Sequence, residues 1–582
     1  MNKYYVLLST GVVLTTACSP KEAQELSKQP NVVVILTDDQ GWGDFGFNGN
    51  PYINTPTLDS LSEISAHLTQ FYSSPLSATT RAGLLTGCYH LRSGALCVTR
   101  AAENMDEDAV TIAEAMRDNG YATGCFGKWH NGAHYPQDPV GQGFDEYVGF
   151  SAGHLTNYFD SELLHNQTPF RAKGYITDVL TDYALDFIKK NKENPFFCYI
   201  PYNAPHAPYQ VPDKYYDKYK HLSKGEEDTT PAVYAMCESV DDNIARVLNY
   251  LDSEGLSENT IVVFFSDNGP NKPRYNGDMR GIKSQTYEGG VRVPCLVYWK
   301  GKINAFELDE NLSYIDIMPT ILALCGIEDA PKMDGVDFSK QLLGDKTKLA
   351  PRTIYTHKSN SDSDLNPFSS LAIKDDYRLL YLSRDNFELY DLDSDPSQTS
   401  DISEMNAKVF ASMRSEMQEW YDEVSVEYEK SKKRMTRIGA VDIESIIPAH
   451  EAIIGGKVHY FTNEHGWAGD WVTNIYKGDT VAWDVEVVEA GEYDFAVEYA
   501  LSSGDIEVSV LGAPSVKLAV FEGELLPSPD RVQRVEAYER TWGSADLGAI
   551  KLSKGQHTIN LDFVKDGLQG DLQVKSIRIK KK

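Results

Sequence analysis

The chain has 582 residues, and its acidic and basic side chains sum to a formal net charge of −30 at pH 7. This length exceeds what one hydrophobic core supports, so we expect two or three domains. Hydrophobic residues make up 41% of the chain and aromatic residues 11%, which excludes a largely disordered protein. The negative charge argues against nucleic acid as a partner, because phosphate binding requires a basic surface.

The first 18 residues have the features of a secretory signal peptide. A lysine is followed by an apolar run from Tyr4 to Leu14 and then by small residues up to Cys18. This run is too short to span a bilayer as a mature helix. Ala17-Cys18 resembles a bacterial lipoprotein cleavage site, although Thr15 stands where leucine is more usual; ordinary signal cleavage nearby is the alternative. We expect export across the inner membrane to the periplasm or outer membrane, with membrane contact only through a lipid anchor.

Predicted strands alternate with predicted helices over residues 30–350. The first strand is the β-branched run NVVVILT, and helix–strand–loop units follow at 109–130, 178–209 and 244–270. This alternation is typical of an α/β domain whose mostly parallel sheet is flanked by helices. Ligands of such domains bind beyond the carboxyl ends of the strands, so these loops are the places to look for a site.

The pattern changes after residue 350. Residues 375–398 predict a short antiparallel sheet, within a subdomain at 351–430, and the basic polar stretch 428–439 predicts a linker. Segments that alternate with period two predict an appended all-β sandwich at 440–582. Two roles are open for this sandwich: it binds carbohydrate, or it only braces the catalytic domain. The first requires that its tryptophans stack on sugars, and the second that they pack in a core. The tryptophans in question are Trp467, Trp471 and Trp542.

Acidic side chains follow two of the predicted buried strands. Asp38 and Asp39 come after NVVVILT, and Asp267 and Asn268 come after TIVVFFS. One such pair alone would be an ordinary turn, but two pairs after matching strands favour four oxygen ligands for one Ca²⁺ or Mg²⁺ ion. No histidine stands beside either pair in the sequence, which argues against a pair of zinc ions.

Four cationic side chains also follow predicted strands. Lys128 and His130 lie in GKWH, His206 lies in the proline-rich NAPHAP, and Lys283 lies in RGIKSQTYEGGVRVP. A single lysine or histidine is usually a solvated or satisfied core residue, yet all four belong to the predicted edge that carries the acidic pairs. With a divalent cation they form a receptor for a tetrahedral oxyanion. A local positive pocket of this kind is compatible with an acidic protein.

The chain resembles the type I, formylglycine-dependent sulfatases of the alkaline phosphatase superfamily, in particular secreted bacterial arylsulfatases. The resemblance implies an alkaline-phosphatase-like mixed, mostly parallel sheet flanked by helices and followed by a small antiparallel subdomain. Each motif alone is weak, but the ordered set is specific. It extends from residue 31 to about residue 400 and comprises NVVVILTDDQGWGD, NTPTLDSL, FYSSPLSATTRAGLLTG, GYATGCFGKWH, PYNAPHAPY, FFSDNGP, RGIKSQTYEGGVRVP, SYIDIMPT and ELYDLDSDP.

The stretch SATTR, residues 77–81, fits the family pattern of Cys or Ser, one residue, Pro or Ala, one residue and Arg. The resemblance therefore implies that Ser77 is oxidised to Cα-formylglycine (3-oxoalanine). Thr79 stands where the family usually has proline. A serine also implies maturation by the anaerobic, serine-type formylglycine-generating enzyme. Two other interpretations of Ser77 are a cap on the following helix and a replacement for a native cysteine.

The resemblance also implies roles for the other candidates. It implies one Ca²⁺ per chain, held by Asp38, Asp39, Asp267 and Asn268. An unmodified serine is a poor nucleophile at neutral pH, whereas a hydrated aldehyde beside a cation offers a more acidic hydroxyl for attack on sulfur. His206, with Lys283, then protonates the departing alcohol. His130 takes the proton of the remaining hydroxyl, so that the aldehyde re-forms and sulfate leaves. Arg81 and Lys128 hold the modified residue.

Three functions fit this sequence. The favoured one is a sulfatase that removes O-sulfate from sulfated carbohydrate, because secretion and an appended sandwich suit a glycan more than a small aryl sulfate. A phosphate or phosphonate monoester hydrolase is the second, since its oxyanion is also tetrahedral, although SDNG argues against the two-zinc phosphatases. The third is a catalytically silent sulfoglycan-binding protein in which Ser77 is never oxidised.

Overall fold

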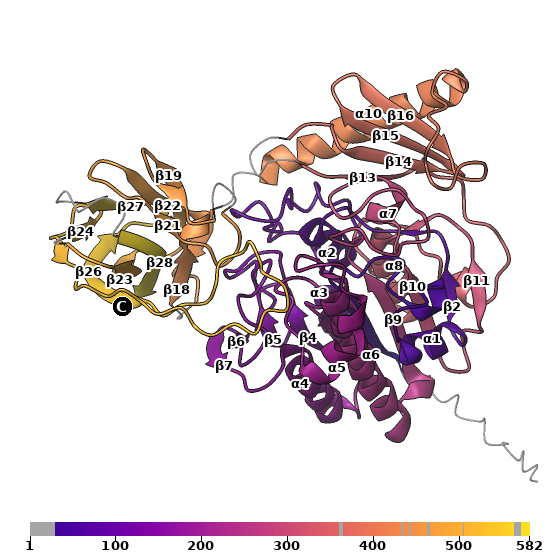
Figure 1. The fold of residues 1–582 in the computed structure, drawn as a ribbon, viewed down its shortest axis with the longest axis horizontal. Helices are drawn as coiled ribbons and strands as arrows, with labels where there is room; N and C mark the ends of the chain where they lie inside the picture. The colour runs from indigo at the N-terminus through magenta and orange to yellow at the C-terminus, as the bar shows by residue number, and fades with distance from the viewer. Residues whose placement is uncertain are drawn as a thin grey trace, which may run out of the picture.

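The computed structural model describes residues 29–359, 365–431, 435–441, 444–462, 466–504, 506–563 and 572–582. The predicted signal peptide and Cys18 lie outside these residues. Within them, no helix combines the length and the apolar character needed to cross a bilayer. Figure 1 shows a large α/β body, with a small sheet and a long helix above the body and a β-sandwich beside it.

The body is built on one mixed sheet of ten strands. Its central strands are parallel, and antiparallel pairs extend it at both sides. This confirms the predicted α/β class. In spatial order the strands are β11 (Phe306–Leu308), β2 (Ala66–Leu68), β10 (Cys295–Trp299), β9 (Thr260–Ser266), β1 (Asn31–Thr37), β8 (Phe196–Pro201), β4 (Ala122–Lys128), β5 (Glu146–Phe150), β6 (Glu162–His165) and β7 (Thr168–Arg171).

Helices cover both faces of this sheet because its central strands are apolar on both sides. In β1, Val32 and Val34 face one core while Val33 and Ile35 face the other. The first core is covered by α2 (Ser77–Thr86), α3 (Ile112–Asp118), α8 (Ile317–Leu324) and α9 (Ser339–Leu342). The second is covered by α1 (Pro56–Ser62), α4 (Ile176–Asn191), α5 (Asp213–Tyr219) and α6 (Thr230–Ser253). A short pair, β3 (Phe71–Tyr72) and β12 (Leu312–Ser313), and the one-turn helix α7 (Glu288–Val291) complete the body.

The small sheet above the body is antiparallel, as the sequence predicts. A long helix, α10 (Ala407–Ser431), packs on one face of this sheet. Met413 and Met417 of the helix pack against Leu379 and Leu389 of the sheet. The helix ends at Ser431, so the first residues of the predicted linker are helical instead. The elements are β13 (Ile354–His357), β14 (Ser370–Lys374), β15 (Tyr377–Ser383), β16 (Asn386–Asp391) and α10 (Ala407–Ser431).

The C-terminal part is a sandwich of two mainly antiparallel sheets around its own apolar core. One sheet contains β17 (Thr436–Ile438), β19 (Ile453–Gly455), β22 (Thr480–Val487), β27 (Gly555–Phe563), β24 (Glu507–Val510) and β25 (Val516–Lys517). The other contains β18 (Ser445–Pro448), β20 (His459–Tyr460), β21 (Val472–Thr473), β28 (Leu572–Lys581), β23 (Gly491–Leu501) and β26 (Gly543–Leu552). Trp483 belongs to this core, but none of the three tryptophans singled out from the sequence does.

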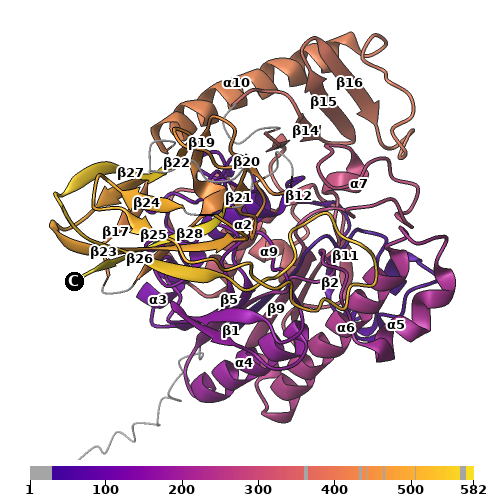
Figure 2. The same ribbon diagram turned by 60° about the vertical axis from the view of Figure 1, so that its left-hand side comes forward.

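A long segment between β25 and β26, residues 518–542, joins the sandwich to the body. It extends from the sandwich over the body in both ribbon views (Figures 1 and 2). Gln210 Nε2 donates to Asp530 Oδ1 at 2.6 Å, and the Arg531 amide donates to the Tyr209 carbonyl at 2.9 Å. The Arg534 guanidinium also donates to the backbone of the body. The sandwich is therefore fixed against the body by specific polar contacts.

A buried ion pair at this junction predicts a pH-dependent stability. His134 Nε2 of the body lies 3.2 Å from Glu451 Oε2 of the sandwich. Burial opposes charge on His134, but Glu451 raises the pKa of this histidine above its ordinary value. A group with a raised pKa stabilises the fold at pH values below the ordinary histidine pKa of about 6.5, and this stability is lost as pH rises through the folded-state pKa.

We therefore expect His134→Gln to cost about 1.5–3 kcal/mol of unfolding free energy at mildly acidic pH, with the difference from wild type shrinking as pH rises. Thermal unfolding of both proteins across a pH series measures this. His165→Gln is the matched control, because His165 is an exposed histidine whose Glu146 partner is 3.9 Å away. A His134→Gln cost that stays constant with pH would contradict the expectation.

Candidate active site

The acidic pairs meet at one edge of the sheet because their strands are neighbours. Thr37 of β1 pairs with Ser266 of β9 in parallel register, so the residues that follow leave the sheet side by side. The Asp39 amide donates to Asp267 Oδ1 at 3.2 Å, and Asn268 Nδ2 donates to Asp39 Oδ1 at 2.8 Å. The structure therefore brings together all four residues that the sequence proposed as oxygen ligands.

These four residues suit a hard cation. Three of their buried oxygens have no hydrogen-bond partner among the described residues: Asp38 Oδ1, Asp39 Oδ2 and Asn268 Oδ1. Burial and the neighbouring Asp38 raise the pKa of Asp267 to about 7, which reflects the cost of several carboxylates in one buried place. Unpaired carboxylate and amide oxygens are the ligands that Ca²⁺ and Mg²⁺ take.

Ser77 is the first residue of α2, and its hydroxyl points to His130. The residue at the N-cap position is Leu76, which makes no side-chain cap, so the interpretation of Ser77 as a helix cap is wrong. The neighbouring hydroxyls have structural partners: Thr79 Oγ1 lies 2.6 Å from Ser74 Oγ, and Thr80 Oγ1 donates to the Asp267 carbonyl at 2.7 Å. Of this hydroxyl cluster, Ser77 is the one that contacts a candidate catalytic side chain.

The hydrogen bonds of His130 fix its neutral tautomer. Ser77 Oγ lies 3.0 Å from His130 Nδ1, and His130 Nε2 lies 2.9 Å from the Val98 carbonyl oxygen. A carbonyl only accepts, so Nε2 carries the proton and Nδ1 accepts from the Ser77 hydroxyl. Burial, together with Lys128, holds the pKa of His130 well below its ordinary value. The ring is therefore arranged to take a proton from residue 77.

Two buried cations connect this pair to the acidic cluster. Arg81 Nη2 donates to Asp267 Oδ2 at 2.8 Å, and Arg81 Nη1 donates to the Lys128 carbonyl at 3.0 Å. Lys128 Nζ donates to Asp38 Oδ2 at 2.5 Å. Burial lowers the pKa of Lys128 and outweighs the opposing effect of Asp38. The positive charges of Arg81 and Lys128 therefore offset the negative charges of Asp267 and Asp38 near Ser77.

The other two predicted cations, Lys283 and His206, lie close to Asp39. Lys283 Nζ donates to Asp39 Oδ1 at 2.5 Å, and His206 Nε2 lies 3.9 Å from Asp39 Oδ2. Burial opposes charge on Lys283, but Asp39 and Asp38 raise the pKa of its ammonium group. The sequence places no histidine beside an acidic pair, yet the fold does, because the loop after β8 returns His206 to the ends of β1 and β9.

Two residues of this site have a strained backbone conformation. Asp39 and His130 both have left-handed backbone angles, with φ of 65° and 67°. This conformation is uncommon for residues other than glycine, and it persists at functional sites where the surroundings hold it. Each residue stands just after a strand and turns its side chain into the site.

A cleft of about 240 Å³ opens above Ser77, and the sandwich forms part of its wall. From the body it is lined by the predicted residues Ser77, His130, His206 and Lys283, with Leu76, Val98, Gly153, His154, Asn271 and Ser284. The sandwich contributes Trp467, Ala468 and Glu536. The sequence raised Trp467 as a sugar-stacking candidate but missed His154 and Glu536. Neither stands in a recognisable motif, so no local signal would have found them.

Comparison with known proteins identifies the family to which the chain belongs. The family model described as sulfatase matches residues 30–327, and the model of the C-terminal part of N-sulphoglucosamine sulphohydrolase matches residues 282–425. An uncharacterised sulfatase of Escherichia coli strain K12, YdeN, is 30% identical over 68% of this chain and 86% of its own length. Mouse N-acetylgalactosamine-6-sulfatase is 31% identical over 57% of this chain and 69% of its own length.

Solved structures show the same fold. The crystal structure of Ps i-CgsB in complex with k-i-k-neocarrahexaose has a TM-score of 0.61 and 28% identity, covering 70% of this chain and 98% of that one. The phosphonate monoester hydrolase of Agrobacterium radiobacter matches with a TM-score of 0.52 at 16% identity, covering 68% of this chain and 96% of that one. This likeness shows the fold alone. The chain belongs to the sulfatase family of the alkaline phosphatase superfamily and is a sulfuric ester hydrolase.

Proposed function

We propose that the protein removes sulfate from a sulfated carbohydrate, with Ser77 converted to Cα-formylglycine and with one Ca²⁺ at the acidic cluster. The observation that carries this proposal is the contact between Ser77 Oγ and His130 Nδ1 at 3.0 Å, at the floor of a cleft that His206 and Lys283 also line. A serine with an adjacent neutral imidazole and a nearby oxygen-rich cluster suits chemistry on an oxyanion ester.

The proposed calcium ligands are Asp38, Asp39, Asp267 and Asn268. The unpartnered oxygens of three of them support this assignment. When bound, Ca²⁺ supplies positive charge that neutralises the sulfate oxygens and makes the hydroxyl of a hydrated aldehyde at position 77 more acidic.

The protein's own side chains account for the proton transfers. His206 lines the cleft and is proposed to protonate the departing sugar oxygen together with Lys283, which lines the same cleft. His130 Nδ1 takes the proton of the hydroxyl that stays on residue 77. This second transfer releases sulfate only when residue 77 is an aldehyde hydrate, because a plain serine has no second oxygen with which to re-form a carbonyl. Arg81 and Lys128 hold that residue in place.

A carbohydrate substrate is supported by the relatives of the chain and by the wall of its own cleft. The relatives include N-acetylgalactosamine-6-sulfatases, and a neighbouring structure contains a neocarrahexaose. In this protein the cleft wall contributed by the sandwich contains Trp467 and Glu536. An indole ring offers a flat surface for a sugar ring, and a carboxylate accepts hydrogen bonds from sugar hydroxyls.

The role of His206 predicts a dependence on the leaving group. His206→Ala is expected to lower kcat/KM for a sugar sulfate by about 10²–10⁴-fold, the usual contribution of a general acid. The loss on p-nitrophenyl sulfate is expected to be much smaller, because its phenolate leaves without protonation. Steady-state kinetics on both substrates measure the difference.

His221→Ala is the control for this comparison, because His221 is an exposed histidine of the body that does not line the cleft. It is expected to change neither rate. Equal losses on both substrates in His206→Ala would assign His206 to substrate binding instead of proton donation.

We also propose export across the inner membrane, maturation by an anaerobic serine-type formylglycine-generating enzyme, and a lipid at Cys18. The N-terminal pattern and the serine at position 77 support these proposals. Cys18→Ser should release the protein into the soluble fraction of a native host, whereas retention on membranes would contradict the lipid anchor.

A further inference from the structure

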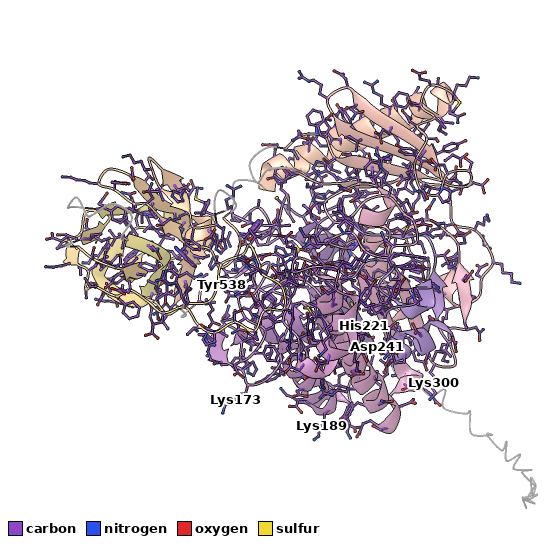
Figure 3. The ribbon with its side chains drawn as sticks, viewed as in Figure 1. Lys173, Lys189, His221, Asp241, Lys300 and Tyr538 are labelled. Carbon is purple, nitrogen blue, oxygen red and sulfur yellow. The ribbon has the colours of Figure 1, made fainter. Side chains whose placement is uncertain are left out.

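A second cavity lies at the boundary between the body and the sandwich. Its volume is about 370 Å³. The body contributes residues 149–152 and 154–157 and part of the β6–β7 hairpin. The sandwich contributes an aromatic and cationic group, Trp471, Tyr538, Arg540, Trp542 and Lys575, together with Gly469, Glu498 and Glu539. Tyr538 is visible at this boundary in Figure 3.

This cavity adjoins the active-site cleft. His154 lines both cavities, and its ring stacks on the ring of His206 with centroids 6.5 Å apart. A molecule that placed one group in the cleft and extended past His154 would enter the second cavity. The two spaces therefore suit adjacent units of one extended ligand.

The charges on the cavity wall favour an anion. Lys575 Nζ donates to the Gly469 carbonyl at 2.6 Å, and the Arg540 guanidinium donates to Gln573 Oε1 at 2.5 Å. Among the described residues, neither cation has a carboxylate within ion-pair distance. Three acidic residues also line the cavity, and each is paired with an arginine outside it: Glu162 and Glu539 with Arg171, and Glu498 with Arg578.

Buried hydrogen-bonding atoms on the wall also lack partners. Trp471 Nε1, His154 Nε2 and Arg540 Nε have none among the described residues. The side chains of Trp471 and His154 are 2% and 8% exposed. Unsatisfied buried groups are costly, so they point to a ligand rich in oxygen. Trp542 adds an aromatic surface, since its ring lies 5.1 Å from that of Trp471 and beneath the Arg540 guanidinium.

We propose that this cavity is a carbohydrate subsite for the sugar next to the one that loses its sulfate, and that it selects a neighbouring sugar with an anionic group. Lys575 and Arg540 bind that group, and Trp542 packs against the sugar ring. The anionic group is a sulfate ester or a uronic acid carboxylate. This subsite rests on the proposed function and deepens it, because it makes the sandwich part of the substrate-binding surface.

The test uses the formylglycine-containing enzyme with p-nitrophenyl sulfate as the reporter. Inhibition constants are measured for sulfated monosaccharides and for disaccharides in which the neighbouring sugar is sulfated, uronic or neutral. At least one anionic disaccharide is expected to bind about tenfold more tightly than its monosaccharide and its neutral counterpart. The sulfated and uronic members of the panel separate the two sources of charge.

Substitutions then locate the effect. Lys575→Met and Trp542→Ala are each expected to reduce the disaccharide advantage about tenfold, measured as the ratio of inhibition constants so that changes common to all ligands cancel. Lys551→Met is the matched control, because Lys551 is an exposed lysine of β26 in the same sandwich. It should leave the ratio unchanged.

The outcomes separate the subsite from the proposed function. Absence of p-nitrophenyl sulfate hydrolysis would contradict the proposed function itself. Hydrolysis without any preference for anionic disaccharides would overturn the subsite alone. A preference that survives both Lys575→Met and Trp542→Ala would also overturn it, since the selective groups would then lie elsewhere. Each variant must be folded, with the Tm of the wild type. If Lys575→Met fails to fold, Lys575→Gln replaces it.

Discussion

Ser77→Ala is expected to abolish sulfate ester hydrolysis, with a loss of several orders of magnitude in kcat. The reason is that Ser77 Oγ is the hydroxyl at the floor of the cleft in contact with the His130 imidazole. Protein from a host with the anaerobic serine-oxidising system is expected to carry an aldehyde at residue 77. Mass spectrometry would show this as a peptide lighter by the mass of H₂.

Protein made without that system is the control. It is expected to keep the hydroxyl and to lack turnover, yet to bind sulfated sugar, since Lys128, Lys283 and the acidic cluster are in place without the modification. Binding by calorimetry, measured beside turnover, distinguishes this state from a misfolded one. Full turnover by protein with unmodified Ser77, or by Ser77→Ala, would mean that another group is the nucleophile.

Thr79 stands where the family pattern usually has proline, and the oxidation of residue 77 can also be used to test its effect. It is the third residue of α2, where proline is tolerated because the first turn of a helix leaves its amide groups unpaired. Its hydroxyl contacts Ser74 Oγ and donates to the Leu76 carbonyl. In Ser77→Cys protein from a host that oxidises only cysteine, Thr79→Pro is expected to raise the converted fraction if maturation is limiting. The loss of two hydrogen bonds is its structural cost.

Much of the site was predictable because its residues follow strands of one sheet. In a parallel sheet the carboxyl ends share an edge, so Asp38 and Asp267 were expected to meet, and the register of β1 and β9 places them together. Glu536 and His154 were not predictable. They reach the cleft through the docking of the sandwich and through a loop without a motif, and both depend on tertiary contacts that no local pattern encodes.

The helix α6 shows the same limit at the level of the fold. The periodic apolar pattern predicts a helix only from residue 244, but the helix begins at Thr230. Its first half carries acidic residues that look like loop residues in the sequence. In the structure Glu238 accepts from the Tyr219 hydroxyl, and Asp241 accepts from the amides of Thr57 and Leu58 at the start of α1. Partners distant in sequence make burial of these carboxylates possible.

Removal of divalent cations is expected to reduce hydrolysis to background, with Ca²⁺ restoring it. The acidic cluster holds buried oxygens without hydrogen-bond partners among the described residues, so a bound cation also stabilises the folded state. At a concentration of 100 times its Kd, a ligand adds about 2.7 kcal/mol. The Tm is therefore expected to rise on addition of Ca²⁺ to the metal-free protein, and this readout is independent of catalysis.

Asn268 offers the sharpest variants for this test. Asn268 Nδ2 donates to Asp39 Oδ1, while Asn268 Oδ1 has no partner among the described residues. Asn268→Leu removes that oxygen and is expected to abolish the rise in Tm with Ca²⁺. Asn268→Asp keeps an oxygen but places a second carboxylate against Asp39, so it should lower the Tm without Ca²⁺ and enlarge the rise on its addition. Asp345→Asn, an exposed site after α9, is the control and should behave as wild type. The calcium site would be removed from the mechanism by full activity in metal-free protein. A rise in Tm with Ca²⁺ that is as large in Asn268→Leu as in wild type would contradict the site equally.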